Sequence, residues 1–118
     1  MKKLLTLILM LIFLATPLPA KQSPVYTGDA LVITGQGIFL GIAVSSDGTN
    51  NITVDIYDNN KTETGDRLIN QWVVTTSAVN RNHSIGFSKE DEVTYRQGIY
   101  VDVTTSGTVS YQLYFLSQ

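Results

Sequence analysis

The sequence predicts an all-β fold: an antiparallel β-sandwich of jelly-roll or immunoglobulin-like type, with about seven or eight strands, preceded by an N-terminal signal peptide. After residue 27, most segments alternate apolar and polar residues with a period of two, the spacing of a half-buried strand. Clusters of Gly, Asn, Asp and Ser interrupt these segments about every 8 to 12 residues, and no helical periodicity there extends beyond one turn. These observations favour a sandwich, although strand spacing alone does not exclude a closed barrel.

A secretory leader is predicted at residues 1–20. Lys2 and Lys3 provide a positive start, residues 4–15 are almost all apolar, and the small Ala20 ends the segment. The apolar run is short for a membrane span, which needs about 20 residues. We expect cleavage after Ala20, with an uncleaved membrane anchor as the alternative. The processed protein would then be secreted, periplasmic or on the cell surface, with membrane contact only through the leader before cleavage.

Behind the leader, we expect a flexible N-terminal segment at residues 21–27 and one sandwich domain at residues 28–118. About 98 residues is an ordinary size for a single domain. The sequence contains no Cys, which excludes a disulfide framework and a lipidated cysteine. It has eight Lys and Arg residues, two of them in the leader, against ten Asp and Glu residues. Nucleic acid is not an expected partner, because phosphate binding needs clustered basic side chains.

The first half of the domain is predicted to contain two strands joined by a hairpin. In the first strand, alternation places Ile38, Leu40, Ile42 and Val44 on the core face and Phe39, Gly41 and Ala43 on the outer face. Asp47 and Gly48 then supply the backbone angles of a tight turn. In the second strand, the core face carries Ile52, Val54 and Ile56, and the outer face carries Thr53, Asp55 and Tyr57.

The second half is predicted to be mostly extended and to end in another hairpin. Residues 58–66 form a polar loop, the segment around Trp72 is extended, and Ile85 and Phe87 alternate as a short strand. The charged run at 88–92 is expected to form a turn or a single helical turn. The last two strands place on their core faces Ile99, Val101 and Val103, then Val109, Tyr111, Leu113 and Phe115. Ser106 and Gly107, between them, suit a two-residue hairpin turn.

Four stretches of the chain together resemble a known group of proteins. They are ALVITGQGIFLGIAVSS at 30–46, ITVDIYDN at 52–59, TGDRLI at 64–69 and GIYVDVTTSGTVSYQLYF at 98–115. Their order, over roughly residues 26–116, is similar to that in small β-sandwich proteins encoded among the structural genes of tailed bacteriophages and related prophages. The resemblance implies a role on a virion surface or as a decoration of an assembly, and no enzymatic activity.

Catalytic chemistry is not expected. His83 is the only His, and its neighbours contain no nucleophile motif such as G-x-S-x-G. A general base also needs an orienting partner, and the sequence identifies none. Nothing singles out a glycosidase-type pair among the carboxylates that could supply one, which are Asp55, Asp58, Glu63, Asp66, Glu90, Asp91 and Glu92.

A structural calcium ion is the one cofactor to consider. Calcium prefers oxygen ligands, and these are offered near predicted strand ends by Asp47, Asn50, Asp55, Asp58, Asn59 and Asn60. Their spacing does not match an EF-hand loop. The preferred interpretation is that these side chains cap their own backbone in Asx turns, so no metal or cofactor site is predicted.

Aromatic residues provide the candidate interaction surface. It comprises Phe39, Tyr57, Trp72, Tyr100 and Tyr114, most of which alternate with the predicted core positions. Outward aromatic side chains are common where subunits meet, and they also stack on sugars in carbohydrate-binding modules. A register error of one residue would exchange the two faces of a strand and bury them.

We therefore expect an exported, non-enzymatic protein that acts through its surfaces. The first hypothesis is a subunit or decoration of an extracellular or virion-like assembly, partnered by copies of itself or by another surface protein. The alternative is a secreted module that binds carbohydrate or another cell-surface polymer.

Overall fold

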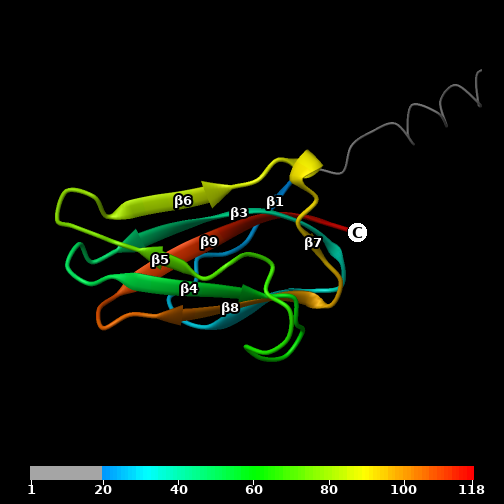
Figure 1. The fold of residues 1–118 in the computed structure, drawn as a ribbon, viewed down its shortest axis with the longest axis horizontal. Coiled ribbons are helices and arrows are strands. Elements are labelled where there is room, and N and C mark those ends of the chain that lie inside the picture. Colours follow the sequence, from blue (N-terminus) through cyan, green and yellow to red (C-terminus); the bar gives the residue numbers. More distant parts are fainter. Residues whose placement is uncertain (1–19) are drawn as a thin grey trace, which may run out of the picture.

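The structure, a computed structural model, describes residues 20–118, so the predicted leader lies outside the described residues except for Ala20. The described chain forms two antiparallel β-sheets packed as a sandwich (Figure 1). The predicted all-β antiparallel sandwich is confirmed. No helix within residues 20–118 is long and apolar enough to cross a membrane.

The first sheet, sheet A, has the strand order β1-β9-β3-β6, and β7 also pairs with β3. Its strands are β1 (Lys21–Gln22), β3 (Gly37–Ser46), β6 (Asn82–Gly86), β7 (Thr94–Tyr95) and β9 (Val109–Ser117). The second sheet, sheet B, has the order β2-β8-β4-β5. Its strands are β2 (Ala30–Thr34), β4 (Ile52–Tyr57), β5 (Trp72–Val74) and β8 (Gly98–Thr104).

The hydrophobic core lies between the sheets and follows the period-two alternation in β4, β8 and β9. The predicted core residues of these strands are buried except for the half-buried Val103: Ile52, Val54, Ile56, Ile99, Val101, Val109, Tyr111, Leu113 and Phe115. Each buried aliphatic or Phe side chain contributes roughly 1.5–3 kcal/mol of hydrophobic stabilisation. The predicted core faces of β4, β8 and β9 are confirmed.

The predicted core face of β3 is wrong in the first half of the strand. Phe39 is fully buried (0% exposed), whereas Leu40, which was predicted to share the core face with Ile42, is only half-buried. The register of β3 against β9 shifts between Phe39 and Gly41. This β-bulge moves the alternation by one residue, so Phe39 points into the core together with Ile42.

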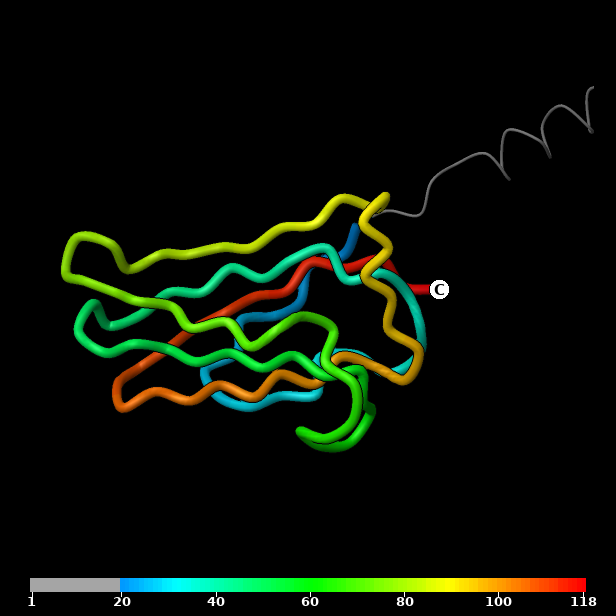
Figure 2. Tube along the Cα trace, in the orientation of Figure 1, coloured from blue at the N-terminus to red at the C-terminus, as the bar shows by residue number. Residues whose placement is uncertain are grey.

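Both predicted hairpins are also wrong, because each divides its strands between the two sheets. β3 lies in sheet A and β4 in sheet B, while β8 lies in sheet B and β9 in sheet A. The connections after β3 and after β8 lie at the same end of the sandwich (Figure 2). The two connections meet at Asp47, whose carboxylate accepts hydrogen bonds from the backbone N–H of Asn50 (3.0 Å) and of Thr108 (3.2 Å). Hydrogen bonds from the Asn50 and Thr49 amides hold the pKa of Asp47 well below its ordinary value.

The N-terminal segment lies along β9 in sheet A. Ser23 N–H donates to the Leu113 carbonyl and Leu113 N–H donates to Ser23 Oγ, both at 2.9 Å. Tyr26 and Tyr111 exchange two backbone hydrogen bonds of 2.9 Å. The Tyr111 hydroxyl, whose pKa is raised mainly by burial, donates to the carbonyl of Gly28. This segment therefore covers the edge that β9 would otherwise present.

The charged run at 88–92 forms a single 3-10 turn, η1 (Lys89–Asp91). A single helical turn was one of the two predicted alternatives. Ser88 N–H donates to Asp91 Oδ2 at 2.7 Å and caps the turn. The short strand predicted around Ile85 is present as β6. The region that has the weakest periodicity in the sequence thus forms one side of the sandwich.

Candidate interaction surface

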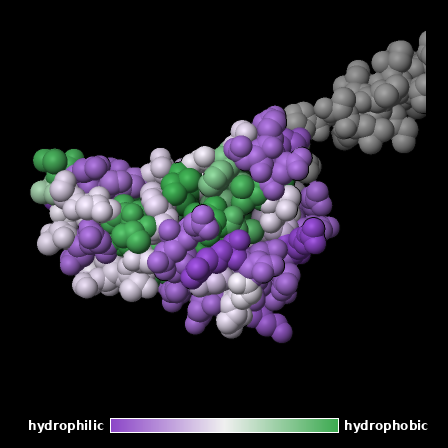
Figure 3. Space-filling view, in the orientation of Figure 1, coloured by the Kyte–Doolittle hydropathy of each residue, from purple (hydrophilic) through white to green (hydrophobic). Residues whose placement is uncertain are grey.

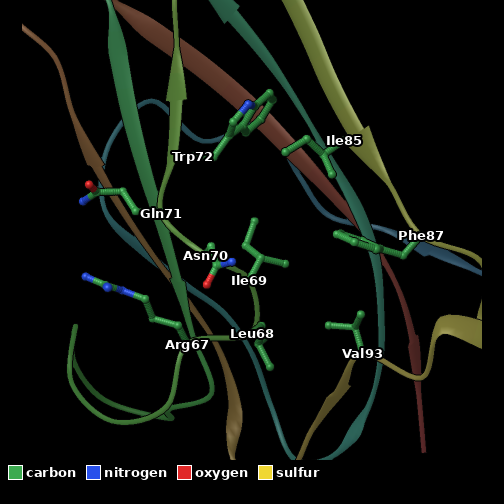
Figure 4. A pocket seen from close by; sticks show the side chains of 9 residues that line it. All are labelled: Arg67, Leu68, Ile69, Asn70, Gln71, Trp72, Ile85, Phe87 and Val93. Carbon is green, nitrogen blue, oxygen red and sulfur yellow. The ribbon is translucent and has the colours of Figure 1, made fainter.

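The sandwich has an apolar groove along one side, between the edge strands β5 and β6. The groove has a volume of about 560 Å³. Its apolar lining consists of Leu68, Ile69, Trp72, Ile85, Phe87 and Val93, with Arg67, Asn70 and Gln71 at the margin (Figure 4). Hydrophobic side chains gather on this face of the molecule between hydrophilic borders (Figure 3). We refer to this feature as the edge groove.

An irregular stretch before β5 builds the sheet B side of the edge groove. Leu68 N–H donates to the Ile56 carbonyl at 2.8 Å, so the chain begins to pair with β4 there. Strand pairing lapses at residues 69–71 and resumes at Trp72. Because of this interruption, the half-buried side chains of Leu68, Ile69 and Trp72 line the groove (Figure 4).

The sheet A side of the edge groove consists of Ile85 on β6 and of Phe87 and Val93, which flank η1. The Phe87 ring packs against the ring of Phe39, with centroids 6.0 Å apart. Phe39 N–H also donates to the Val93 carbonyl at 2.7 Å. The groove lining is therefore continuous with the hydrophobic core, and the groove is where that core reaches the surface.

A polar hollow of about 540 Å³ adjoins the groove and shares Arg67, Leu68 and Val93 with it. Its lining includes both carboxylates and guanidinium groups, from Asp58, Asp66, Glu92 and Arg96. Asp58 accepts hydrogen bonds from the backbone N–H groups of Arg96 (2.9 Å) and Gln97 (2.8 Å), so its carboxylate anchors the turn before β8. The edge of the sandwich thus has an apolar section and a charged section.

The structure separates the aromatic residues that were predicted to form one surface. Phe39 was predicted to face outward and is buried, so this placement is wrong, and the bulge in β3 is the cause. Trp72 lines the edge groove. Tyr114 is 37% exposed on the outer face of sheet A, and only Tyr57 and Tyr100 lie side by side, as cross-strand partners on sheet B.

The outer face around Tyr57 is covered by a polar side chain. The guanidinium of Arg67 lies 5.6 Å from the centroid of the Tyr57 ring, and its Nε lies 3.1 Å from Asp55 Oδ1 without hydrogen-bond geometry. Gln71 donates to Asp55 Oδ2 at 3.0 Å. Asp55, predicted to point to the outer face, is therefore only 6% exposed, because Arg67 and Gln71 lie against it.

Two carboxyl groups, those of Asp29 and Asp102, meet on the same outer face. Asp29 Oδ1 accepts a hydrogen bond from the Val103 N–H at 2.8 Å. The pKa of Asp102 is raised to about 6, first by loss of hydration and then by the hydrogen bond and the negative charge of Asp29. Protonated Asp102 can donate to Asp29, whereas two ionised carboxylates repel each other.

Replacing Asp102 by Asn is expected to reduce the pH dependence of stability. The folded-state pKa of Asp102 lies above its ordinary value of 3.8, so its contribution is complete below about pH 4 and is lost as the pH rises through 6. In thermal melts at about pH 5 and about pH 8, Asp102→Asn should show a smaller difference in melting temperature than the wild type. Glu90→Gln, at an exposed position on η1, is the control and should keep the wild-type difference. An unchanged difference for Asp102→Asn would contradict the shared proton.

Asp and Asn side chains that were considered as calcium ligands cap their own loops. Asp47 accepts from Thr49 N–H at 2.8 Å, and Asn59 accepts from Lys61 N–H at 2.8 Å. The predicted Asx turns are confirmed at these two positions. Within residues 20–118, no group of three or more acidic, His or Cys side chains is arranged to hold a metal ion.

His83 lies on β6, with Nε2 3.2 Å from the carbonyl oxygen of Asn80. The carboxylates considered for a catalytic pair are distributed over different elements. Asp55 lies on β4, Glu63 in the loop that follows, and Glu90 in η1. The polar contact that His83 makes is with a backbone carbonyl, and structural and catalytic His residues both make such contacts.

Most residues of the edge groove were not identified from the sequence. Leu68, Ile69 and Val93 lie in stretches without strand or helix periodicity, so they were not assigned to any face. The available signal was the presence of large apolar side chains inside otherwise polar loops. Where several such residues gather on one surface, they form an apolar patch, and such patches mark contact sites.

Comparison with protein-family models, with curated proteins and with solved structures finds no match for this chain.

Proposed function

We propose that this protein is an exported, non-enzymatic subunit of an extracellular or virion-like assembly, and that it associates with copies of itself along the β5–β6 side. The observation that carries the proposal is the uncovered edge groove, where the core reaches the surface through aliphatic and aromatic side chains. Large exposed apolar patches are uncommon on monomeric soluble domains and mark contact sites.

Two further features support an assembly role. The strands pair in a nested order: β1 with β9, β2 with β8, β3 with β6 and β4 with β5. We infer from this order that the sandwich is a jelly roll, an architecture of capsid and lectin domains. The resemblance of residues 26–116 to sandwich proteins of tailed bacteriophages favours the same role. Since one fold serves many functions, the groove remains the principal support.

A carbohydrate-binding module fits the aromatic residues less well. Stacking on a sugar needs an open ring face. The guanidinium of Arg67 lies over the ring of Tyr57, and Tyr100 and Trp72 are half-buried. An apolar groove between two sheet edges is better suited to the side chains of a protein partner.

Introducing a charge into the edge groove is expected to abolish self-association. Ile69→Lys places an ammonium among apolar side chains that a partner would otherwise cover, so desolvating it should weaken association by about tenfold or more. The measurement is sedimentation or light scattering over a range of concentrations. Trp72 is the only Trp, so a blue shift of its emission with concentration reports on burial of the groove.

Leu31→Lys is the matched control for Ile69→Lys. Leu31 is 39% exposed on β2, at the edge of sheet B opposite β5, and does not line the groove. This variant should associate like the wild type. A wild-type protein that remains monomeric at every concentration, with an invariant Trp72 emission, would contradict the proposal.

A further inference from the structure

The edge strands of the two sheets differ in how well they are protected against pairing with another chain. β1 has two residues and is followed closely by Pro24, β2 has a register shift between Leu31 and Ile33, and β5 has three residues. Short strands, Pro and bulges all discourage edge pairing. β6 has five residues in regular register with β3 and contains neither Pro nor Lys. Within residues 20–118, β6 is therefore the least protected edge.

Alternate residues of β6 direct their backbone N–H and C=O groups away from β3. Phe87 N–H donates to the Leu40 carbonyl at 2.7 Å, and Ser46 N–H donates to the Arg81 carbonyl at 2.9 Å. The odd-numbered residues of β6 therefore direct their N–H and C=O groups toward β3. Alternation in an antiparallel pair then directs outward the N–H and C=O groups of Asn82, Ser84 and Gly86.

We infer that β6 pairs antiparallel with β6 of a second copy about a twofold axis at Ser84. In this register, Ser84 faces Ser84 of the second copy and Asn82 faces Gly86. Identical antiparallel strands are self-complementary, so each outward N–H meets an outward C=O and sheet A continues across the dimer. The outward-facing residues of β6 carry no charge, so no like charges oppose each other across the axis.

The same pairing covers the edge groove. Ile85 extends from β6 toward the groove (Figure 4). In the dimer, β6 of the second copy lies beside β6 of the first. Ile85 and His83 of the second copy then lie on the same face of sheet A as Ile85 of the first copy. The two grooves then meet across the axis, so Trp72 and Phe87 lose exposed surface. One contact thus pairs the free backbone groups of β6 and covers the half-buried apolar side chains of the groove.

This inference rests on the proposed self-association and specifies its geometry. The test uses protein produced from the full 118-residue sequence. Ser84→Lys alone, or Ser84→Glu alone, brings like charges face to face at the axis and should weaken the dimer by about fivefold or more. An equimolar mixture of the two variants should restore dimers, because Lys then faces Glu. The readout is the dimer dissociation constant from sedimentation.

Two further variants separate edge pairing from effects on folding and from the effect of an added charge. Ser84→Pro removes an N–H that β3 does not use, and edge strands tolerate Pro at such a position. The monomer should therefore stay folded by circular dichroism while the dimer weakens by about tenfold or more. Ser110→Lys adds the same charge to the outer face of β9, which β3 separates from β6, and should dimerise like the wild type.

The outcomes distinguish this inference from the proposed function. Wild-type dimers that are unaffected by Ser84→Lys, or a mixture of Lys and Glu variants that stays monomeric, would overturn the twofold pairing and leave self-association standing. Wild-type protein that is monomeric at every concentration would overturn both. In that case, a strand from a different protein would be the remaining occupant of the β6 edge.

Discussion

Phe39→Ala is expected to lower the free energy of unfolding by about 3 to 5 kcal/mol, the usual cost of removing a buried aromatic side chain. Phe39 is 0% exposed in the core and packs against Phe87 at the base of the edge groove. A loss of this size is a large fraction of the stability of a small domain, which is about 5 to 15 kcal/mol. Denaturant unfolding followed by Trp72 fluorescence measures it.

Tyr114→Ala is the matched control, because alternation in the sequence predicts an outward direction for both aromatic side chains. Tyr114 is 37% exposed on the outer face of sheet A, so its loss should cost about 1 kcal/mol or less. If the two variants lost similar stability, the bulge in β3 would not reverse the direction of Phe39.

Gly41→Ala is expected to destabilise the protein by about 1 to 3 kcal/mol, because β6 passes too close to β3 for a side chain. A Cβ atom at Gly41 would lie 2.5 Å from the Ile85 carbonyl oxygen and 3.1 Å from Gly86 Cα. Both contacts are with backbone, so neither strand can relieve them by a side-chain rotation. The change should also disturb the β6 edge and weaken self-association. Unfolding curves and sedimentation measure the two effects.

Gly28→Ala is the control for Gly41→Ala. No atom lies within 4 Å of the position that a Cβ at Gly28 would occupy, so the change should alter stability by less than about 1 kcal/mol. Equal losses for the two variants would mean that the close approach of β6 to Gly41 does not limit the fold.

Strand direction was predictable where the ladder is regular. In β4, β8 and β9, a side chain on the core face is in general followed by one on the outer face, as the alternation of the sequence predicts. The exceptions are Asp55, which Arg67 and Gln71 cover, and Leu116, which is buried beside Phe115. The capping roles of Asp47 and Asn59 were predictable for a similar reason. An Asx turn involves a side chain and the backbone a few residues away, so its chemistry lies in one short stretch of sequence.

The candidate site was much less predictable. Two aromatic residues at its base, Phe39 and Phe87, meet only because a bulge turns one inward and β6 places the other beside it. Leu68 and Ile69 line the groove because strand pairing lapses before β5, which no periodicity indicates. The division of β3 and β4 between two sheets was not predictable either, because a strand alternates in the same way whichever sheet it joins.

Composition, alternation and turn residues were sufficient to predict that residues 28–118 form an acidic, antiparallel all-β domain with capped loops. Alternation and capping could be predicted because each depends on neighbours a few residues apart. Strand order, the bulge in β3 and the free β6 edge were decided only in the tertiary structure. They depend on which distant segments pair. The alternation of polar and apolar residues along a strand does not identify its partner, because many partner strands are compatible with the same alternation.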